Sequence, residues 1–301
     1  MSFYTIFWDG VGYGKPNPQE NPFFSASLPT LSKLCNSALP SLENLHIHTE
    51  KLSTTPVDAN LDIDGLPQSG TGQTSLFSGV NAAKIFGKHF GPYPPTQLHS
   101  IIKEKNLFQQ LREQNKKSFF ANAYPQKYFD YIFSSRGKIP TVAFSYLSAQ
   151  YSLNTHKELS EQNAISGGCN NDHWKIMGYD VPTITTFEAG KNFYGFGKKY
   201  DYVFFEYFFT DKAGHSQNMK EAIYALEIMD NFLEGIFSVF DEKNDTLIFI
   251  SDHGNIEDLT TKSHTRNPVP LIVIGKGKEY FSNAVKSLVD FTPAVVEFLT
   301  K

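Results

Sequence analysis

Short apolar runs, separated by polar turns and by segments with helical periodicity, limit what this chain can fold into. They read FYTIFW at 3–8, SFFAN at 118–122, YVFFEY at 202–207, TLIFI at 246–250 and PLIVI at 270–274. Uninterrupted apolar runs of this length suit strands inside a parallel sheet that is covered on both faces. The sequence predicts helices between them, near 70–79, 104–115, 217–238 and 289–299. This alternation predicts an α/β fold, a doubly wound sheet with helices on both sides.

The segment from about residue 126 to residue 198 breaks this alternation. It contains SSRGKIP, SGGCNNDH and YDVPTITT, which are rich in Gly, Pro, Asn and Ser. Such a composition is typical of turns and irregular connections. We therefore expect one core from residues 1–125 and 199–301, with 126–198 as a small inserted cap over one end of the sheet.

Charge and cysteine usage argue against several classes of protein. The 301 residues carry a formal net charge of -4, whereas a nucleic-acid-binding surface normally shows a basic stripe. No apolar run approaches the ~20 residues of a membrane-spanning helix, and MSFYTIFWDG is expected to be a first strand and not a signal peptide. Cys35 and Cys169 form neither a CxxC pair nor a disulfide framework. The sequence predicts a cytoplasmic protein without a nucleic-acid or membrane partner, and it leaves the oligomeric state open.

Carboxylates and imidazoles stand at the ends of the predicted strands or in the loops beside them. The set comprises Asp9, Asp211, His215, Asp252, His253 and His264. A lone Asp after a strand is more often a turn or capping residue, so no single member identifies a site. Ligands of open α/β sheets bind at the carboxyl edge of the strands, however, so that distant groups can converge there. The complete set predicts a catalytic site for two divalent cations, because oxygen and nitrogen donors without Cys suit zinc or manganese.

A hydroxyl-rich segment, GLPQSGTGQTSLFSGVNA at 65–82, leads into the first predicted helix. One alternative is that a Ser or Thr at this position acts as an N-cap, which is a purely structural role. The same position faces the positive end of the helix dipole, where a phosphate group would be held. A neighbouring metal ion would favour the alkoxide and make the hydroxyl a nucleophile. Ser69 and Thr71 are the two candidates.

These segments resemble those of a known family. WDGVG, PQSGTGQTSLFSG, TDKAGHSQN, SDHGN and HTRNPVP follow the order found in the alkaline phosphatase superfamily and reach from residue 9 to residue 270. The chain most closely resembles the metalloenzyme branch, which includes cofactor-independent phosphoglycerate mutase and phosphopentomutase. The resemblance implies an alkaline-phosphatase-like three-layer αβα core with a mostly parallel central sheet and a small inserted cap.

By this resemblance, the predicted ligands divide between two ions. One ion would be held by Asp211, His215 and His264. The other would be held by Asp9, Asp252 and His253, together with the nucleophile. The nucleophile of the superfamily stands ten residues before a glycine, and Gly79 fills that position when Ser69 is the nucleophile. Ser69 is therefore favoured over Thr71.

The resemblance also implies phosphoryl transfer, in which a metal-bound alkoxide attacks phosphorus and forms a phosphoenzyme. Water then releases phosphate, as in a phosphatase, or the phosphate returns to another hydroxyl of the substrate, as in a mutase. The mutases carry a far larger, arginine-rich inserted domain, whereas this chain has only Arg112, Arg136 and Arg266. We expect a phosphomonoesterase or small phosphomutase that acts on a phosphorylated metabolite.

Two other functions fit parts of the pattern: a phosphodiesterase or phosphonate hydrolase of the same superfamily, and a metal-binding module without catalysis. A sulfatase is disfavoured, because neither cysteine stands in the C-x-P-x-R motif that sulfatases use. In GKHFGPYP, Lys88 and His89 follow the nucleophile segment and are candidates to meet the phosphate or the leaving group. A solvated loop explains these two residues equally well.

Overall fold

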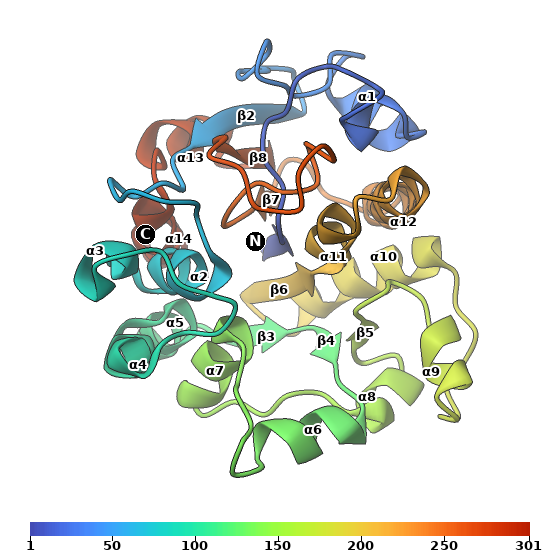
Figure 1. Cartoon of the computed structure of the whole chain (residues 1–301). Helices are drawn as coiled ribbons and strands as arrows, with labels where there is room; N and C mark the ends of the chain where they lie inside the picture. Colours follow the sequence, from blue (N-terminus) through green and yellow to red (C-terminus); the bar gives the residue numbers. More distant parts are fainter.

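A six-stranded sheet forms the centre of the computed structural model, which describes residues 1–301 (Figure 1). Its strands lie in the order β2-β8-β7-β1-β6-β3. Their bounds are Phe3–Trp8 for β1, Leu52–Val57 for β2, Ser118–Phe120 for β3, Tyr202–Tyr207 for β6, Thr246–Ile250 for β7 and Val269–Gly275 for β8. The predicted strands are confirmed, except that the run at 118–122 is divided into β3 and a separate short strand, β4 (Asn122–Ala123). β2 was not predicted, because half of its sequence LSTTPV is Ser or Thr.

The sheet is mostly parallel, as predicted, and the exception lies at one side. β1 pairs in parallel with β6 and β7, and β3 pairs in parallel with β6. β8 runs antiparallel to both of its neighbours, β7 and β2. An antiparallel β8 begins at the edge where β7 ends, so residues 251–268 between them stay at one edge of the sheet.

Helices cover both faces of the sheet, because side chains along each strand alternate between the faces. One face packs against α1 (Pro29–Leu34), α10 (Thr186–Gly195) and α12 (Met219–Phe237). The other face packs against α2 (Ser69–Ser78), α5 (Leu107–Glu113), α7 (Thr141–Ser148), α13 (Lys278–Ala284) and α14 (Leu288–Thr300). The two layers lie on opposite sides of the strands in Figure 1. The predicted three-layer αβα core is confirmed.

The remaining elements are short. They are α3 (Ala82–Phe86), α4 (His99–Lys105), α6 (Gln126–Ile132), α8 (His156–Ser160), α9 (Asp172–Ile176), α11 (Phe209–Ser216), β4 (Asn122–Ala123), β5 (Ile165–Ser166) and the 3-10 turns Pro22–Phe24, Thr96–Leu98 and Phe196–Lys198. None of the helices in the structure combines the length and the apolar character needed to cross a membrane.

Capping residues explain two differences from the predicted helices. The helix expected near 104–115 is two helices, α4 and α5, because the side chain of Asn106 accepts a hydrogen bond from the Gln109 N–H and starts a new helix. The helix expected at 217–238 begins after Asn218, whose side chain accepts from the N–H groups of Lys220 and Glu221. The preceding residues, expected as a loop, form α11.

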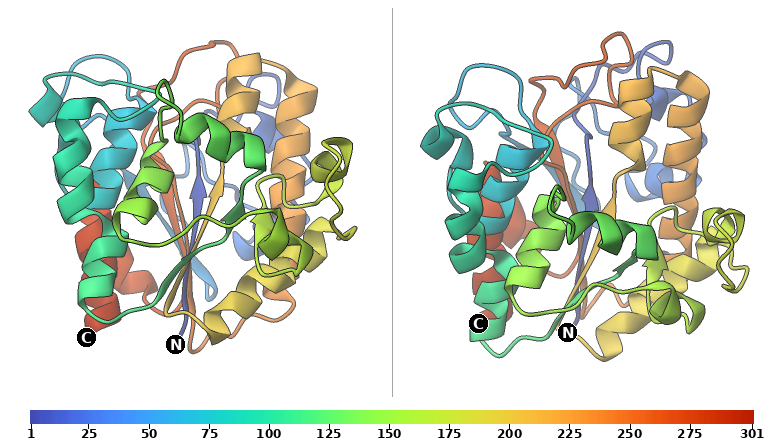
Figure 2. Two further views of the ribbon diagram at one scale, coloured as in Figure 1. Left: turned by 90° about the horizontal axis from the view of Figure 1, so that it is seen from below. Right: turned by 60° about the horizontal axis from the view of Figure 1, so that its bottom comes forward.

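The segment 126–198 packs against both helical layers. α7 packs against α2, α4 and α5, and α10 packs against α12. A small apolar cluster joins Leu159, Ala164, Trp174 and Val181 of this segment to Ala123 of β4. In Figure 2 the green part of this segment lies in front of the sheet. The division into a core of 1–125 and 199–301 and a cap of 126–198 stays a prediction.

Two glycines allow α10 and α12 to pack closely, and this contact supports a stability prediction. A Cβ at Gly235 would collide with the carbonyl oxygen of Phe187, and one at Gly190 with that of Phe232. Gly235→Ala is expected to lower the free energy of unfolding by about 2 kcal/mol or more, as overpacked cores do. Urea unfolding followed by circular dichroism measures this.

Gly195 provides the matched control, because it has helical dihedral angles and no atom lies within 4 Å of the place that a Cβ would take. Gly195→Ala should leave stability unchanged or raise it by about 0.5 kcal/mol, since alanine restricts the unfolded chain. Equal effects of the two substitutions would contradict the close packing of α10 on α12.

Candidate metal centre

The predicted ligands converge at one edge of the sheet, each delivered by a neighbouring element. Asp9 follows β1, and Asp252 and His253 follow β7, the strand paired with β1. His264 lies in the loop that returns to β8. Asp211 and His215 lie on α11, which follows β6, and their spacing of four places both on one helix face. The two residues were expected in a loop, and the helix is what aligns them.

One group of donors is buried and consists of Asp9, Asp252 and His253. The Nε2 atom of His253 lies 3.6 Å from Asp9 Oδ1 and 3.5 Å from Asp252 Oδ2. Asp252 and His253 are fully buried, and Asp9 is nearly so. Both carboxylate oxygens of Asp252 and the Oδ1 of Asp9 have no hydrogen-bond partner.

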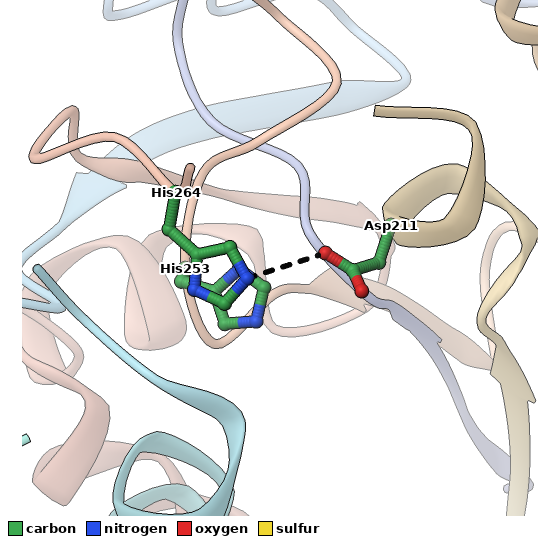
Figure 3. Close-up of side chains that lie close together, drawn as sticks. All are labelled: Asp211, His253 and His264. Atoms are coloured by element: carbon green, nitrogen blue, oxygen red, sulfur yellow. Dashed lines mark ion pairs between the residues drawn. The ribbon is translucent and has the colours of Figure 1, made fainter. Parts of the chain in front are cut away.

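A second group consists of Asp211, His253 and His264 (Figure 3). The Nε2 atom of His264 lies 3.6 Å from Asp211 Oδ1, the pair joined by the dashed line in Figure 3. His215 completes this group, with its Nε2 atom 3.4 Å from Asp211 Oδ2 and 3.3 Å from His264 Nε2. The rings of His253 and His264 are stacked with centroids 3.7 Å apart, so the two groups adjoin.

Backbone carbonyls orient two of the imidazoles. The Nδ1 atom of His215 lies 2.7 Å from the Lys262 carbonyl oxygen, and that of His264 lies 2.7 Å from the Pro67 carbonyl oxygen. In each ring Nδ1 therefore donates, which leaves the Nε2 lone pair directed into the site. Metal-binding histidines are commonly held by such an outer hydrogen bond.

The electrostatics of the site fit divalent cations. Burial, together with the charge of Asp252, raises the pKa of Asp9 well above its usual value, and burial also raises the pKa of Asp252. Burial lowers the pKa of His264 to about 4, helped by the charge of His253, so this imidazole is neutral at pH 7. Buried carboxylates without partners are costly unless a cation compensates them. The oxygen and nitrogen donors present suit such an ion.

Asp211 differs from the other two carboxylates. Burial by itself would raise its pKa. The imidazoles of His215 and His253 and the side-chain amide of Asn255 outweigh that effect, so the pKa of Asp211 lies below its usual range. Asn255 Nδ2 donates to Asp211 Oδ1 at 2.7 Å. Asp211 is therefore ionised and held in place near neutral pH, as a metal ligand has to be.

Ser69 is the first residue of α2 and lies against this site. Its Oγ atom is 3.0 Å from His253 Nε2. The glycines after it allow a close approach: a Cβ at Gly70 would collide with the carbonyl oxygens of Phe90 and Tyr93. A Cβ at Gly72 would lie 3.1 Å from the Asp252 carbonyl oxygen. The small residues of SGTG thus let α2 begin directly beside the carboxylates.

Thr71, the other nucleophile candidate, is fully buried and has a structural role. Its Oγ1 atom accepts a hydrogen bond from the Phe90 N–H at 3.1 Å and lies 3.3 Å from the Gln68 carbonyl oxygen. The Thr71 N–H also donates to the Phe90 carbonyl oxygen. Its hydroxyl is therefore occupied in holding the Phe90 loop on α2.

Three further residues near the site were not predicted. The Glu257 carboxylate accepts hydrogen bonds from the N–H groups of Gly12 and Asn255 and from the side chains of Thr265 and Asn267, so it ties the loop after β1 to the β7–β8 connection. Asn255 positions Asp211, as described above. Glu206 is buried within β6, and this burial raises its pKa to about 8. A lone carboxylate inside the apolar run YVFFEY was the available signal for Glu206.

An open cleft of about 980 Å³ adjoins the ligands, and Asp9, Ser69 and Asp211 are among the residues that line it. Lys88 and His89 do not line this cleft. His89 instead lies near Gly65, and burial lowers its pKa. Contact of these two residues with a substrate stays a prediction that the cleft does not support.

Comparisons with known proteins give partial matches in sequence. The chain is 33% identical over 108 residues to 2,3-bisphosphoglycerate-independent phosphoglycerate mutase of Antithamnion sp., covering 33% of this chain and 21% of that protein. It is 30% identical over 132 residues to the protein of the same name from Desulforudis audaxviator, covering 42% of this chain and 26% of that protein. The match therefore spans about a quarter of the length of these relatives.

Comparisons of structure extend over the whole chain. The PH0037 protein from Pyrococcus horikoshii is 16% identical with a TM-score of 0.60, and the match covers 99% of this chain and 96% of that chain. A mutant alkaline phosphatase of the Antarctic bacterium TAB5, with Mg bound in its M3 site, is 12% identical with a TM-score of 0.58, covering 99% and 97%.

At these identities the structures establish the fold, and the predicted alkaline-phosphatase-like architecture is confirmed. The family rests on the sequence itself. Because the family model described as Metalloenzyme superfamily matches residues 1–300, this chain belongs to the Metalloenzyme superfamily.

Proposed function

We propose that this protein is a two-metal phosphoryl-transfer enzyme that uses Ser69 as its nucleophile and forms a phosphoseryl intermediate. The observation that carries the proposal is the position of Ser69 Oγ, 3.0 Å from His253 Nε2 and at the N-terminus of α2. A hydroxyl beside metal-binding donors is activated as a nucleophile, and a helix N-terminus attracts the phosphate that it attacks. Membership of the Metalloenzyme superfamily agrees with this chemistry.

The two groups of donors would hold two divalent ions. One ion would take Asp211, His215 and His264. The other would take Asp9, Asp252 and His253, with Ser69 completing its ligands. Zinc or manganese fits this mixture of carboxylate and imidazole. When bound, the ions would supply Lewis-acid stabilisation of the charge on the attacking and leaving oxygens.

The side chains have defined tasks in the proposed reaction. The Ser69 oxygen attacks phosphorus, forming the Oγ–P bond as the bond from phosphorus to the substrate alcohol breaks. The proton that Ser69 gives up is balanced by the one that the leaving alcohol oxygen takes up. Water then attacks the phosphoserine, breaks the Oγ–P bond and releases inorganic phosphate. The serine regains its proton, so atoms and charge balance over the cycle.

A phosphomonoesterase acting on a phosphorylated metabolite is the function that we favour. None of the three arginines of the chain lines the cleft, so a substrate carboxylate would find no arginine there. A small phosphomutase shares the first half-reaction and is the second candidate. The intact donor set and Ser69 speak against a metal-binding module without catalysis.

Turnover of chromogenic esters tests the proposal. Protein stripped of metal and reconstituted with Zn²⁺ or Mn²⁺ should hydrolyse p-nitrophenyl phosphate, and chelation should abolish this activity. The monoester should be preferred over bis-p-nitrophenyl phosphate by at least about tenfold in kcat/KM, equivalent to 1.4 kcal/mol. A preference for the diester would instead identify a phosphodiesterase, and the absence of turnover with every metal would contradict the proposal.

A further inference from the structure

The cleft has more space than the binding of a phosphate group beside the metal ligands requires. It measures about 980 Å³ and continues from Ser69 between the β4 region and the residues of α9, α11 and α12. Clefts of ~300–1,000 Å³ commonly enclose drug-sized organic molecules. Most of its space therefore lies beyond the phosphate end, where the alcohol part of a substrate would be bound.

Aromatic rings line this part of the cleft. They include those of Tyr93, Tyr124, Tyr128, Phe208, Phe209 and Tyr224. Tyr124 and Tyr128 are stacked with centroids 4.2 Å apart, and Phe208 and Phe209 with centroids 4.7 Å apart. Ring faces and edges arranged in this way bind another planar ring by stacking or by edge-to-face contact, in addition to burying its area.

The mouth of the cleft carries apolar side chains that are exposed to water. Ile176 is 82% exposed and Tyr224 is 63% exposed, and Met177 and Phe208 lie on the same cleft. Single exposed apolar residues are common, but a group of them around one opening marks a binding surface. The surface is continuous with the end that Ser69 lines, so both would contact one ligand.

The charges of the cleft disfavour a second acidic group on that ligand. Asp172 and Glu221 line it in addition to the ligand carboxylates, whereas Glu206, whose pKa is raised to about 8, is mostly uncharged near neutral pH. Lys212 is the only lysine on it, and its Nζ atom lies 5.7 Å from the ring centroid of Phe209. A substrate carboxylate placed beyond the phosphate would therefore meet more negative than positive charge.

We infer that the cleft selects phosphate monoesters whose alcohol part is aromatic and carries no acidic group. The inference rests on the proposed function for the phosphate end, where Ser69 and the metal ligands lie. It adds a substrate class: aryl-alkyl or heteroaryl-alkyl phosphates over small polyol phosphates and over phosphorylated hydroxy acids.

Phosphonates test the inference by binding alone, without turnover. Calorimetry with the metal-reconstituted protein compares 2-phenylethylphosphonate, ethylphosphonate and 2-carboxyethylphosphonate. Burying a phenyl ring should make the first bind at least about tenfold more tightly than the second. The third should bind no more tightly than ethylphosphonate. Equal binding of the first two, or tightest binding of the carboxylate, would overturn the inference.

Exposed residues of the mouth provide variants that should fold normally. The double variant Ile176→Ser/Tyr224→Ser should reduce the preference for the phenyl compound by about threefold or more. The matched control is Ile85→Ser/Phe133→Ser, which replaces residues that are 56% and 66% exposed and do not line the cleft. The control should keep the full preference, and an equal loss in both variants would count against the cleft.

The corresponding phosphate esters separate this inference from the proposed function. Turnover of 2-phenylethyl phosphate and ethyl phosphate at equal rates, with equal phosphonate binding, would overturn the inference and support phosphatase activity. Selective phosphonate binding without turnover of either ester would support the inference and overturn the proposed catalysis. Because both alcohols are alkyl alcohols, a difference in kcat/KM reflects the ring and not the leaving group.

Discussion

Ser69→Ala is expected to lower kcat for a phosphate monoester by at least about a hundredfold, because the covalent route through Oγ disappears. The substitution should leave the fold intact, since Ser69 is only partly buried and the hydrogen bond of its side chain is with His253. Metal content should stay close to that of the unaltered protein, because carboxylates and imidazoles supply the other donors. Steady-state kinetics at measured metal content, with circular dichroism, provides the test.

Thr71 supplies the control for this prediction. Thr71→Ala removes the acceptor of the Phe90 N–H, so it should cost about 1–3 kcal/mol of stability while kcat falls less than for Ser69→Ala. Thr71→Ser keeps the hydroxyl and should restore most of the stability. If Thr71→Ala is inactive and Ser69→Ala active, the nucleophile is two residues further along the chain.

The phosphoenzyme gives an independent readout. Acid quenching during turnover, followed by mass spectrometry, should find phosphate on the peptide that contains PQSGTGQT. Ser69→Ala should yield no such phosphopeptide, whereas Thr71→Ala should still yield it. If neither substitution affects turnover, the covalent mechanism fails, although the two-metal site would remain.

His253→Ala is expected to have a comparably large effect, through loss of metal. The imidazole is a proposed ligand of one ion, with its Nε2 atom 3.6 Å from Asp9 Oδ1 and 3.5 Å from Asp252 Oδ2, and it stacks on His264 of the other group. Removing it should lower the bound divalent metal from about two ions per chain to about one or fewer, and turnover by about a thousandfold or more. Elemental analysis after reconstitution measures the first effect, and His46→Ala, at an exposed residue outside the site, is the matched control.

Metal removal should also destabilise the unaltered protein. Without a cation, Asp9 and Asp252 remain buried with unpaired oxygens, and the stabilisation that comes from binding is lost. Chelation should therefore lower the melting temperature, and the addition of Zn²⁺ or Mn²⁺ should restore it. Because the imidazole ligands bind only in their neutral form, metal occupancy should fall as the pH drops through their titration range. A protein that takes up no divalent metal after reconstitution would contradict the proposed metal site.

Local pattern explains why much of this protein could be predicted. The strands β1, β6, β7 and β8 consist mainly of apolar residues. Such a run predicts a buried strand whichever strand it pairs with. Their carboxyl ends and connecting loops are equally visible in the sequence. Because β1 and β7 are parallel, as predicted, Asp9, Asp252 and His253 at their carboxyl ends lie at one edge of the sheet.

Other features depend on contacts between distant residues, and the sequence carries only a weak signal of them. β2 is a strand because LSTTPV pairs with β8, although half of its residues are Ser or Thr. Asp211 and His215 share a helix face because α11 forms between β6 and Asn218, in a segment that reads as a loop. Lys88 and His89 follow the nucleophile segment closely, but they do not line the cleft.

The sequence by itself determined the α/β class, the run of buried strands and the set of side chains able to hold metal, because these depend on residue type and short-range spacing. The tertiary structure alone decided the antiparallel direction of β8, which keeps His264 at the same edge as Asp252. It also decided that Ser69 meets His253 across 184 positions of the chain, and that aromatic residues from separate segments form one cleft. These arrangements arise from packing between elements far apart in sequence. The free energy of that packing depends on long-range contacts, which no local pattern encodes.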